Sequence, residues 1–195
     1  MKMNSTNLKS CGRFLWAGLV KHGQTGDFWP SQRFLVARMI APVPEGYRGR
    51  IIELGAGTGA LTVRLAERCR DARLLACEIN AALASMNRAR LTEAGVLGRA
   101  EVVVESAEHL LAALPQRGIR KVRYVISGIP LGNMAGKRVR GLIGTIRRVL
   151  IPGGLYIQFQ HSLMDRAKIR EVFPKLRITP VWLNVPPAVV YYATR

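Results

Sequence analysis

The strongest structural signal in this chain is the stretch Ile51-Ile52-Glu53-Leu54-Gly55-Ala56-Gly57-Thr58-Gly59. Its apolar start predicts a buried parallel strand, and the apolar residues that follow it recur with helical spacing. Glycines at alternate positions permit a tight turn and let a ligand approach the backbone, which a Cβ would prevent. The next helix offers free N–H groups at its N-terminus. A strand, a glycine turn and a helix in this order predict a site for a nucleotide-like cofactor.

Two cofactors are compatible with this turn. Gly55, Gly57 and Ala60 satisfy the dinucleotide pattern G-x-G-x-x-G/A, so the motif alone also allows NAD. Three features favour S-adenosylmethionine. The glycines continue to Gly59, and Glu53 stands two residues before them, where a carboxylate can anchor a cationic amino-acid group but would repel a pyrophosphate. The third feature is the way in which the predicted sheet ends.

Residues 73–78 form a second apolar strand that ends in an acid, nineteen residues after Gly59. A carboxylate at the end of the second strand accepts hydrogen bonds from ribose hydroxyls. We therefore expect Glu78 to bind the ribose, with Ile79 beside it in the cofactor site.

The rest of the chain alternates apolar strands with helices, which implies parallel strands. The predicted strands are 50–54, 73–78, 101–105, 121–127 and 154–160, the last after a turn at Pro152-Gly153-Gly154, and the predicted helices are 58–69, 80–94, 107–114 and 133–149. A further helix, 31–40, is predicted with Ser31 as its N-cap.

The end of the chain is different. Two β-rich runs, 177–183 and 188–193, are separated only by residues 184–187, which are too few for a crossover helix, so the two strands must pair antiparallel. NAD domains ordinarily end on a parallel strand. An α/β fold with a mostly parallel seven-stranded sheet and an antiparallel C-terminal hairpin is the Rossmann-like fold of class I methyltransferases.

The fourth predicted strand ends in the loop Ser127-Gly128-Ile129-Pro130-Leu131. Ligands of open α/β sheets bind at the carboxyl ends of the strands, so this loop should face the methyl group. We expect backbone carbonyls at Ser127, Gly128 and Ile129 to orient a substrate amine, and Ser127 also to contact the cofactor. Orientation and proximity supply most of the catalysis of an in-line displacement.

His161 follows the fifth strand at the same edge of the sheet. It is a candidate base for the amine, directly or through water. The alternative is that His161 contacts a phosphate of the substrate or only packs, while water takes the proton. Lys137, Arg138 and Arg140 follow the catalytic loop and are either phosphate ligands or a solvated helix face.

Composition limits the class of protein. A chain of 195 residues with 49% hydrophobic content predicts one globular domain. Its apolar runs fall short of the ~18 residues that a spanning helix needs, and the N-terminus lacks the apolar core of a signal peptide. Cys11, Cys69 and Cys77 have no metal-ligand spacing, so we expect reduced cytosolic thiols and no metal.

Charge is strongly one-sided. Thirty basic residues against twelve acids give a formal net charge of +18, and residues 1–26 and 109–164 contain no acid. Such blocks create a positive field that attracts a polyanion, either a nucleic acid or an anionic membrane.

Residues 4–22 carry apolar side chains at helical spacing and cations on the other faces. This pattern predicts an amphipathic helix that either lies in a membrane interface or packs on the domain, since periodicity does not separate the two. We assign residues 1–30 to an arm and cofactor lid and 31–195 to the catalytic domain. The expected membrane-binding residues are Lys9, Arg13, Phe14, Trp16 and Lys21.

Four segments together resemble bacterial phospholipid N-methyltransferases: the glycine motif beginning at Glu53, the loop 127–131, the segment 26–31 and the ending Gln158-Phe159-Gln160. The resemblance implies stepwise methylation of phosphatidylethanolamine toward phosphatidylcholine with S-adenosylmethionine. It also implies peripheral attachment to the cytoplasmic face of the membrane through the N-terminal helix. By the same resemblance, Phe28, Pro30 and Ser31 would cover the cofactor.

One position departs from the family pattern. Methyltransferases usually carry an acid followed by alanine after the third strand, where the acid holds the adenine edge. Here Ser106 precedes Ala107. The Ser106 hydroxyl can replace the acid more weakly, or Glu105 or Glu108 can substitute for it, and the sequence leaves this choice open.

Three other functions remain as alternatives. Ornithine-lipid N-methylation uses the same chemistry on a different amino lipid. Ribosomal RNA adenine N6-methyltransferases share the glycine motif, but they need an aromatic residue after the fourth strand to stack a flipped base, and the loop 127–131 has none. A non-enzymatic basic module would not need Glu53 and Glu78. We therefore expect a membrane surface and a phospholipid as partners, and neither nucleic acid nor a stable protein partner.

Overall fold

The structure, a computed structural model, describes residues 32–195. Several predicted features lie outside this range: the helix 4–22, the thiol Cys11, the membrane-binding residues Lys9, Arg13, Phe14, Trp16 and Lys21, and the lid residues Phe28, Pro30 and Ser31. In the described part of the chain, no helix is long and apolar enough to cross a bilayer.

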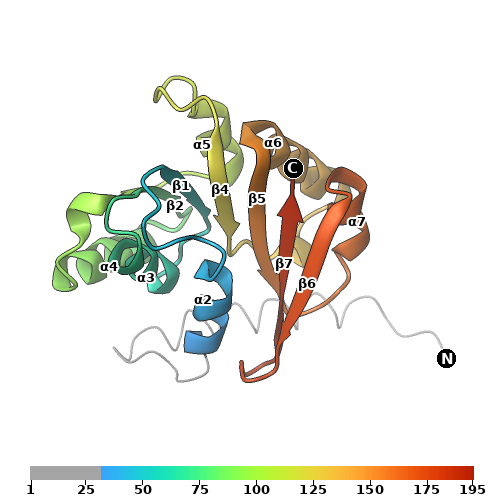
Figure 1. Cartoon of the computed structure of the whole chain (residues 1–195), viewed down its shortest axis with the longest axis horizontal. Coiled ribbons are helices and arrows are strands. Elements are labelled where there is room, and N and C mark those ends of the chain that lie inside the picture. The colour runs from blue at the N-terminus through green and yellow to red at the C-terminus, as the bar shows by residue number, and fades with distance from the viewer. Residues whose placement is uncertain (1–31) are drawn as a thin grey trace.

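Seven strands form one sheet in the order β3-β2-β1-β4-β5-β7-β6 (Figure 1). The strands are β1 (Arg50–Leu54), β2 (Arg73–Cys77), β3 (Ala100–Val103), β4 (Val122–Ser127), β5 (Leu150–Gln160), β6 (Lys175–Val181) and β7 (Ala188–Thr194). The first five strands pair in parallel, and β7 lies between β5 and β6, antiparallel to both. The predicted class I methyltransferase architecture is confirmed.

Helices cover both faces of the sheet because alternate strand residues are apolar on both sides. Ile51 packs in a core with α2 (Gln32–Ile40), α3 (Ala60–Arg68) and α4 (Ala81–Glu93). Ile52, one residue later, packs in the opposite core with α5 (Ala107–Ala113), α6 (Gly136–Val149) and α7 (Arg166–Val172). Such double-sided burial explains the near-continuous apolar runs that made the strands recognisable.

Four details of the elements differ from the prediction. The helix α7 was not predicted, and the helix expected over 133–149 begins only at Gly136, as α6, after a 3₁₀ turn at Leu131–Asn133. The strand expected over 177–183 is β6, which ends at Val181 and leaves Trp182 and Leu183 in the turn. The strand β5 begins at Leu150 rather than at residue 154. Its register with β4 moves from Val122↔Leu150 to Tyr124↔Leu155, so the Pro-Gly-Gly sequence forms a bulge within the strand instead of a turn before it.

The antiparallel hairpin determines what lies near the ligand edge of the sheet. Because β6 and β5 both run antiparallel to β7, β6 is parallel to β5. The β6–β7 turn therefore lies at the edge where β1, β4 and β5 end, and Figure 1 shows it beyond the arrowhead of β5.

Candidate active site

The glycine turn connects β1 to α3 in a conformation that side chains would disturb. Gly59 has φ +90°, and a Cβ there would lie 2.4 Å from Oδ1 of Asn87 on α4. Gly57 has φ +55°, but a Cβ there would meet no atom within 4 Å. Gly59 is therefore required by packing against α4, whereas Gly57 leaves open space at the carboxyl end of the sheet, where a ligand can approach.

Glu53 is the last residue but one of β1, just before this turn, and is almost completely buried. Burial raises the pKa of its carboxyl group to about 8, a hydrogen bond from Thr62 lowers it, and the nearby charge of Glu78 raises it further. The oxygen Oε2 has no hydrogen-bond partner within the protein. A buried carboxyl oxygen without a partner is costly, and a cationic group beside it would restore the charged form.

Glu78 follows β2 and is also buried. Its Oε2 accepts a hydrogen bond from the backbone N–H of Gly57 (2.9 Å), and its Oε1 accepts one from the N–H of Asn80 (2.9 Å). Glu78 thus fixes the glycine turn against the start of α4. A carboxylate oxygen has a second lone pair, so these bonds are compatible with the ribose role, which stays a prediction.

Two apolar side chains lie exposed at the ends of neighbouring strands. Ile79 follows Glu78 and is 68% exposed, and Val104, at the end of β3, is 46% exposed. The N–H of Glu78 donates to the carbonyl of Val103 (3.1 Å), so the two segments are adjacent. Exposed aliphatic groups in this place are suited to the faces of an adenine ring. Val104 had no distinguishing sequence signal, because isolated valines also occur on ordinary surfaces.

The three candidates for the adenine edge all have partners in the protein. Ser106 caps α5, with Oγ accepting from the N–H of His109 (3.2 Å). Glu105 pairs with Arg117 (2.8 Å) and His109 (3.0 Å). Glu108 pairs with Arg138 (2.6 Å), which holds the pKa of Glu108 below its ordinary value. Ser106 still has a hydroxyl proton to donate, and Ala107 is buried behind it.

The loop after β4 lies against the glycine turn. Gly128 donates its N–H to the carbonyl of Leu54 (2.8 Å), and a Cβ on Gly128 would lie 2.9 Å from the carbonyl oxygen of Gly55. Ser127 is buried, and its Oγ accepts a hydrogen bond from the N–H of Ile129 (3.2 Å). The structure therefore brings the predicted catalytic loop and the predicted cofactor turn into direct contact.

One predicted acceptor in this loop is not free. The carbonyl oxygen of Ile129 accepts hydrogen bonds from the side-chain amides of Gln158 (2.9 Å) and Gln160 (3.0 Å). Both lone pairs of that oxygen are thus used within the protein. These bonds fix Ile129 to β5, and a role for its carbonyl in orienting the amine stays a prediction. Carbonyls 127 and 128 remain the predicted amine contacts.

The glutamines belong to a buried polar group that the sequence did not reveal. The hydroxyl of Tyr156 donates to Oε1 of Gln158 (2.6 Å), so Gln158 is held at both ends of its amide. Burial raises the pKa of Tyr156 far above its ordinary value, which keeps the hydroxyl protonated as a donor. The sequence marked Gln158 and Gln160 as part of the family resemblance and as polar residues in an apolar strand, but it did not indicate these contacts.

His161 lies just beyond β5, where it was expected. Its Nδ1 is 3.0 Å from the carbonyl oxygen of Pro187, so Nδ1 carries the proton, and its ring meets Phe159 edge-on. The side chain is exposed. In this position His161 fastens the β6–β7 turn to the end of β5.

Two of the three cations after the catalytic loop are neutralised. Arg138 pairs with Glu108 (2.6 Å), and Arg140 pairs with Glu171 (2.7 Å). Both acids come from outside the acid-free segment 109–164, so that segment is less basic in the fold than in the sequence. Lys137 is exposed and is the remaining candidate for a phosphate contact.

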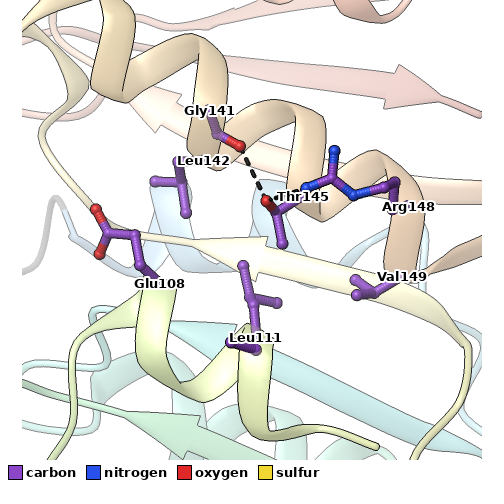
Figure 2. Close-up of a pocket in the computed structure, with 8 residues that line it drawn as sticks. Glu108, Leu111, Gly141, Leu142, Thr145, Arg148 and Val149 are labelled. Atoms are coloured by element: carbon purple, nitrogen blue, oxygen red, sulfur yellow. Dashed lines mark hydrogen bonds between the residues drawn. The ribbon is translucent and has the colours of Figure 1, made fainter.

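A separate groove of about 360 Å³ lies between α5 and α6 (Figure 2). Glu108 lies at one end of it, and the hydrogen bonds of Thr145 with Gly141 and Arg148 lie along its α6 side. None of the residues that line it belongs to the glycine turn or to the catalytic loop. The groove is therefore distinct from the candidate active site.

Comparison with known proteins identifies the fold family. Residues 51–154, more than half of the chain, match the methyltransferase domain family. This chain belongs to that family. The matched segment begins at the strand before the glycine turn and ends in β5, so it includes Glu53, Glu78 and the loop after β4.

One relative by sequence and two solved structures are similar to this chain. An ornithine lipid N-methyltransferase of Singulisphaera acidiphila is 28% identical over 183 residues, which cover 92% of this chain and 94% of that protein. The O-methyltransferase TomG of Streptomyces achromogenes, solved in complex with SAM, superimposes with a TM-score of 0.66 at 17% identity over 86% of this chain and 81% of that one. A precorrin 8W decarboxylase of Methanobacterium thermoautotrophicum gives 0.64 at 19% identity over 86% and 91%. The two solved structures establish the fold alone.

S-adenosylmethionine is the cofactor of this chain, as membership of the methyltransferase family implies. The described residues fit it. The unpartnered Oε2 of Glu53 is suited to the cationic amino-acid end, and the open face of Gly57 leaves room for the ligand against the backbone. When bound, the cofactor supplies an electrophilic methyl group beside the loop 127–131.

Proposed function

We propose that this methyltransferase transfers methyl groups to the amine of a membrane amino lipid, and that an ornithine lipid is the preferred substrate. The observation that carries this proposal is the similarity to an ornithine lipid N-methyltransferase over nearly the full length of both chains. The resemblance noted in the sequence had implied phosphatidylethanolamine first. Both lipids present a primary amine at an anionic interface, so the same loop serves either.

The chemistry requires the amine to lose a proton, because an ammonium ion has no lone pair. In the proposed reaction, the carbonyls of Ser127 and Gly128 accept hydrogen bonds from the amine and direct its lone pair toward the methyl group. Gln158 and Gln160 hold the adjoining Ile129 backbone, so the loop is preorganised. We propose that water accepts the proton and that His161, through the hydrogen bond from Nδ1 to Pro187, serves to hold the β6–β7 turn.

The charge of the chain supports work at a membrane surface. A net charge of +18 attracts anionic lipid headgroups and keeps the protein at the interface where the amine lies. We propose peripheral attachment to the inner face of the cell membrane. Lys137, exposed just after the catalytic loop, is the proposed contact for a headgroup anion.

The test is a substrate comparison with labelled S-adenosylmethionine. Ornithine lipid, phosphatidylethanolamine and unmethylated ribosomal RNA are offered in parallel, with Glu53→Ala as the inactive control. We expect label in ornithine lipid, appearing as successively methylated products. Label only in phosphatidylethanolamine would retain the reaction and change the substrate, and label only in RNA would overturn the lipid assignment.

A further inference from the structure

Five large apolar side chains are exposed in two loops at the ligand edge of the sheet. Leu163 and Met164 follow β5, and Trp182, Leu183 and Val185 form the β6–β7 turn. Their exposed fractions run from 51% to 75%. We call these five residues the apolar edge. Exposed apolar groups gathered in one place indicate an interaction surface, whereas single ones do not.

The two loops of the apolar edge are fastened to one another. Nδ1 of His161 donates to the carbonyl of Pro187, and the hydroxyl of Tyr191 donates to the carbonyl of Ser162 (3.0 Å each). Asn184 is buried in the middle of the turn, where its side-chain amide donates to the carbonyl of Pro186 (2.6 Å). The turn thus buries its polar residue and exposes its apolar ones. A surface that enters an apolar medium needs this arrangement, because an exposed polar group would lose its hydrogen bonds to water there.

The apolar edge faces the same side as the catalytic loop. Leu163 and Met164 come three and four residues after Gln160, whose amide contacts the carbonyl of Ile129 in that loop. The β6–β7 turn lies at the same end, because β6 runs parallel to β5 (Figure 1). A layer that covers the apolar edge therefore also lies beside the site of methyl transfer.

The charges around this surface indicate what that layer is. Residues 161–195 contain six lysines and arginines and two acids, but Lys175 and Arg195 lie at the end of the β6–β7 hairpin away from this surface. Both acids are already paired, Asp165 with Lys168 (2.6 Å) and Glu171 with Arg140 (2.7 Å). Arg166 is exposed two residues after Met164. Apolar side chains, an exposed tryptophan and the exposed Arg166 together match the headgroup region of an anionic bilayer.

We propose that the apolar edge inserts into the interface of an anionic membrane and holds the catalytic loop against the lipid headgroups. This is a membrane contact within the catalytic domain, separate from residues 4–22. Its biological purpose rests on the proposed lipid substrate, whereas its physical binding to a bilayer does not. The surface allows an amino lipid to reach the loop 127–131 while its acyl chains remain in the membrane.

Tryptophan fluorescence tests the insertion directly. The chain has three tryptophans, so Trp16→Phe with Trp29→Phe leaves Trp182 as the sole emitter. With vesicles of phosphatidylglycerol and phosphatidylcholine, we expect a blue shift of its emission and quenching by brominated acyl chains. Vesicles that sediment with the protein while Trp182 emission stays unchanged would overturn the proposal, and so would a failure of the unsubstituted protein to bind vesicles.

A double variant and its control measure how much the apolar edge contributes to the affinity for vesicles. Leu183→Ser combined with Met164→Ser should weaken vesicle binding about tenfold, since affinity follows buried apolar area. The matched control is Leu97→Ser, which replaces a 44% exposed leucine just before β3. The strand β3 is the outermost strand on the side of the sheet opposite β6. Binding of S-adenosylhomocysteine should be unchanged in both. Equal vesicle binding by the edge variant and the control would refute the proposal.

Two further readouts separate this proposal from its rivals. If the edge variant loses activity on lipid in vesicles but keeps it on a dispersed short-chain lipid, the defect is docking. Quenching of Trp182 without any lipid methylation would keep the docking surface and remove the proposed function. Sedimentation without vesicles that shows a dimer dispersed by Leu183→Ser would assign the surface to a second copy of the chain and overturn the membrane proposal.

Discussion

The side-chain amide of Gln160 donates to the carbonyl oxygen of Ile129 across 3.0 Å, so the end of β5 fixes the backbone of the loop after β4. The conformation of the loop therefore depends on a neighbouring strand as well as on its own residues. Since Gln158 donates to the same oxygen, two amides hold one peptide group. Catalysis by positioning depends on such support.

Gln160→Leu should therefore impair turnover without impairing cofactor binding. We expect kcat to fall about tenfold to a hundredfold because the loop loses half of its anchor, while the Kd for S-adenosylhomocysteine changes by less than about twofold. Steady-state kinetics and calorimetry measure the two quantities. Gln116→Leu, on an exposed turn, is the control and should alter neither. A parallel loss of cofactor affinity would contradict the positioning role.

Glu53 should make the stability of the cofactor-free protein depend on pH. Its pKa is about 8 in the folded state against an ordinary 4.5, so the folded state holds the proton more tightly than the unfolded state. The free energy of unfolding therefore falls as pH rises from about 4.5 to about 8. Glu53→Gln cannot ionise and should lose this slope, with a Tm at pH 8 about 3 °C or more above that of the parent. Thermal melts at pH 5 and pH 8 measure it, and equal slopes in the two proteins would refute the buried proton.

The same group should couple cofactor binding to proton release. A cation placed beside Glu53 favours the carboxylate, so binding at pH 6–7 should expel a proton and affinity should increase toward pH 8. Calorimetry of S-adenosylhomocysteine binding in buffers of different ionisation enthalpy detects the proton. Glu53→Gln should bind far more weakly and release none. Binding that is independent of pH in the parent protein would count against an amino-acid anchor at Glu53.

Substitutions at Gly59 and Gly57 should have different effects, the first mainly on the stability of the fold and the second mainly on cofactor binding. Gly59→Ala combines φ +90° with overlap against Asn87, so we expect a loss of about 3 kcal/mol or more in the free energy of unfolding. Gly57→Ala has open space and φ +55°, so it should cost about 1 kcal/mol. However, it should abolish cofactor binding, because its Cβ enters the ligand space. Denaturant melts and calorimetry compare the two variants, and equal destabilisation would contradict the packing argument.

His161→Ala should leave the pH dependence of kcat unchanged, since the ring serves to fasten the β6–β7 turn to β5. Activity on vesicles should decline more than activity on a dispersed lipid, because the turn carries Trp182. A pH–rate profile on the dispersed lipid is the measurement. If the acidic limb of that profile disappears in the variant, His161 is the general base.

Local and nonlocal features differed in how well the sequence predicted them. The glycine turn and the closing hairpin were predicted because each depends on consecutive residues: Gly59 on its own φ, and the hairpin on the few residues between its strands. The contacts of Ile129 with Gln158 and Gln160 were not predicted, because they join residues about thirty positions apart through strand register. The helix α7 was missed because it is short and buries only Ile169.

The same difference between local and nonlocal features applies to the residues of the candidate site. Glu53 and Glu78 could be named from their position after apolar strands, and both are buried beside the turn. Glu105 pairs with Arg117, and Glu108 pairs with Arg138. Both arginines lie outside the segment that carries the acids, so the spacing of residues could not predict these ion pairs. The sequence likewise overestimated the unpaired positive charge of residues 109–164, because acids from other segments form ion pairs with its arginines.

The position of β7 has a consequence for how the chain reaches its native state. β7 comes last in the sequence of strands but lies inside the sheet, where Val190 and Tyr191 are completely buried. Until residues 188–194 emerge from the ribosome, β5 has an unpaired edge and β6 has no neighbour at all. The sheet therefore closes only after synthesis of its final strand, and the open edge of β5 is the place where a nascent or truncated chain is most exposed to aggregation.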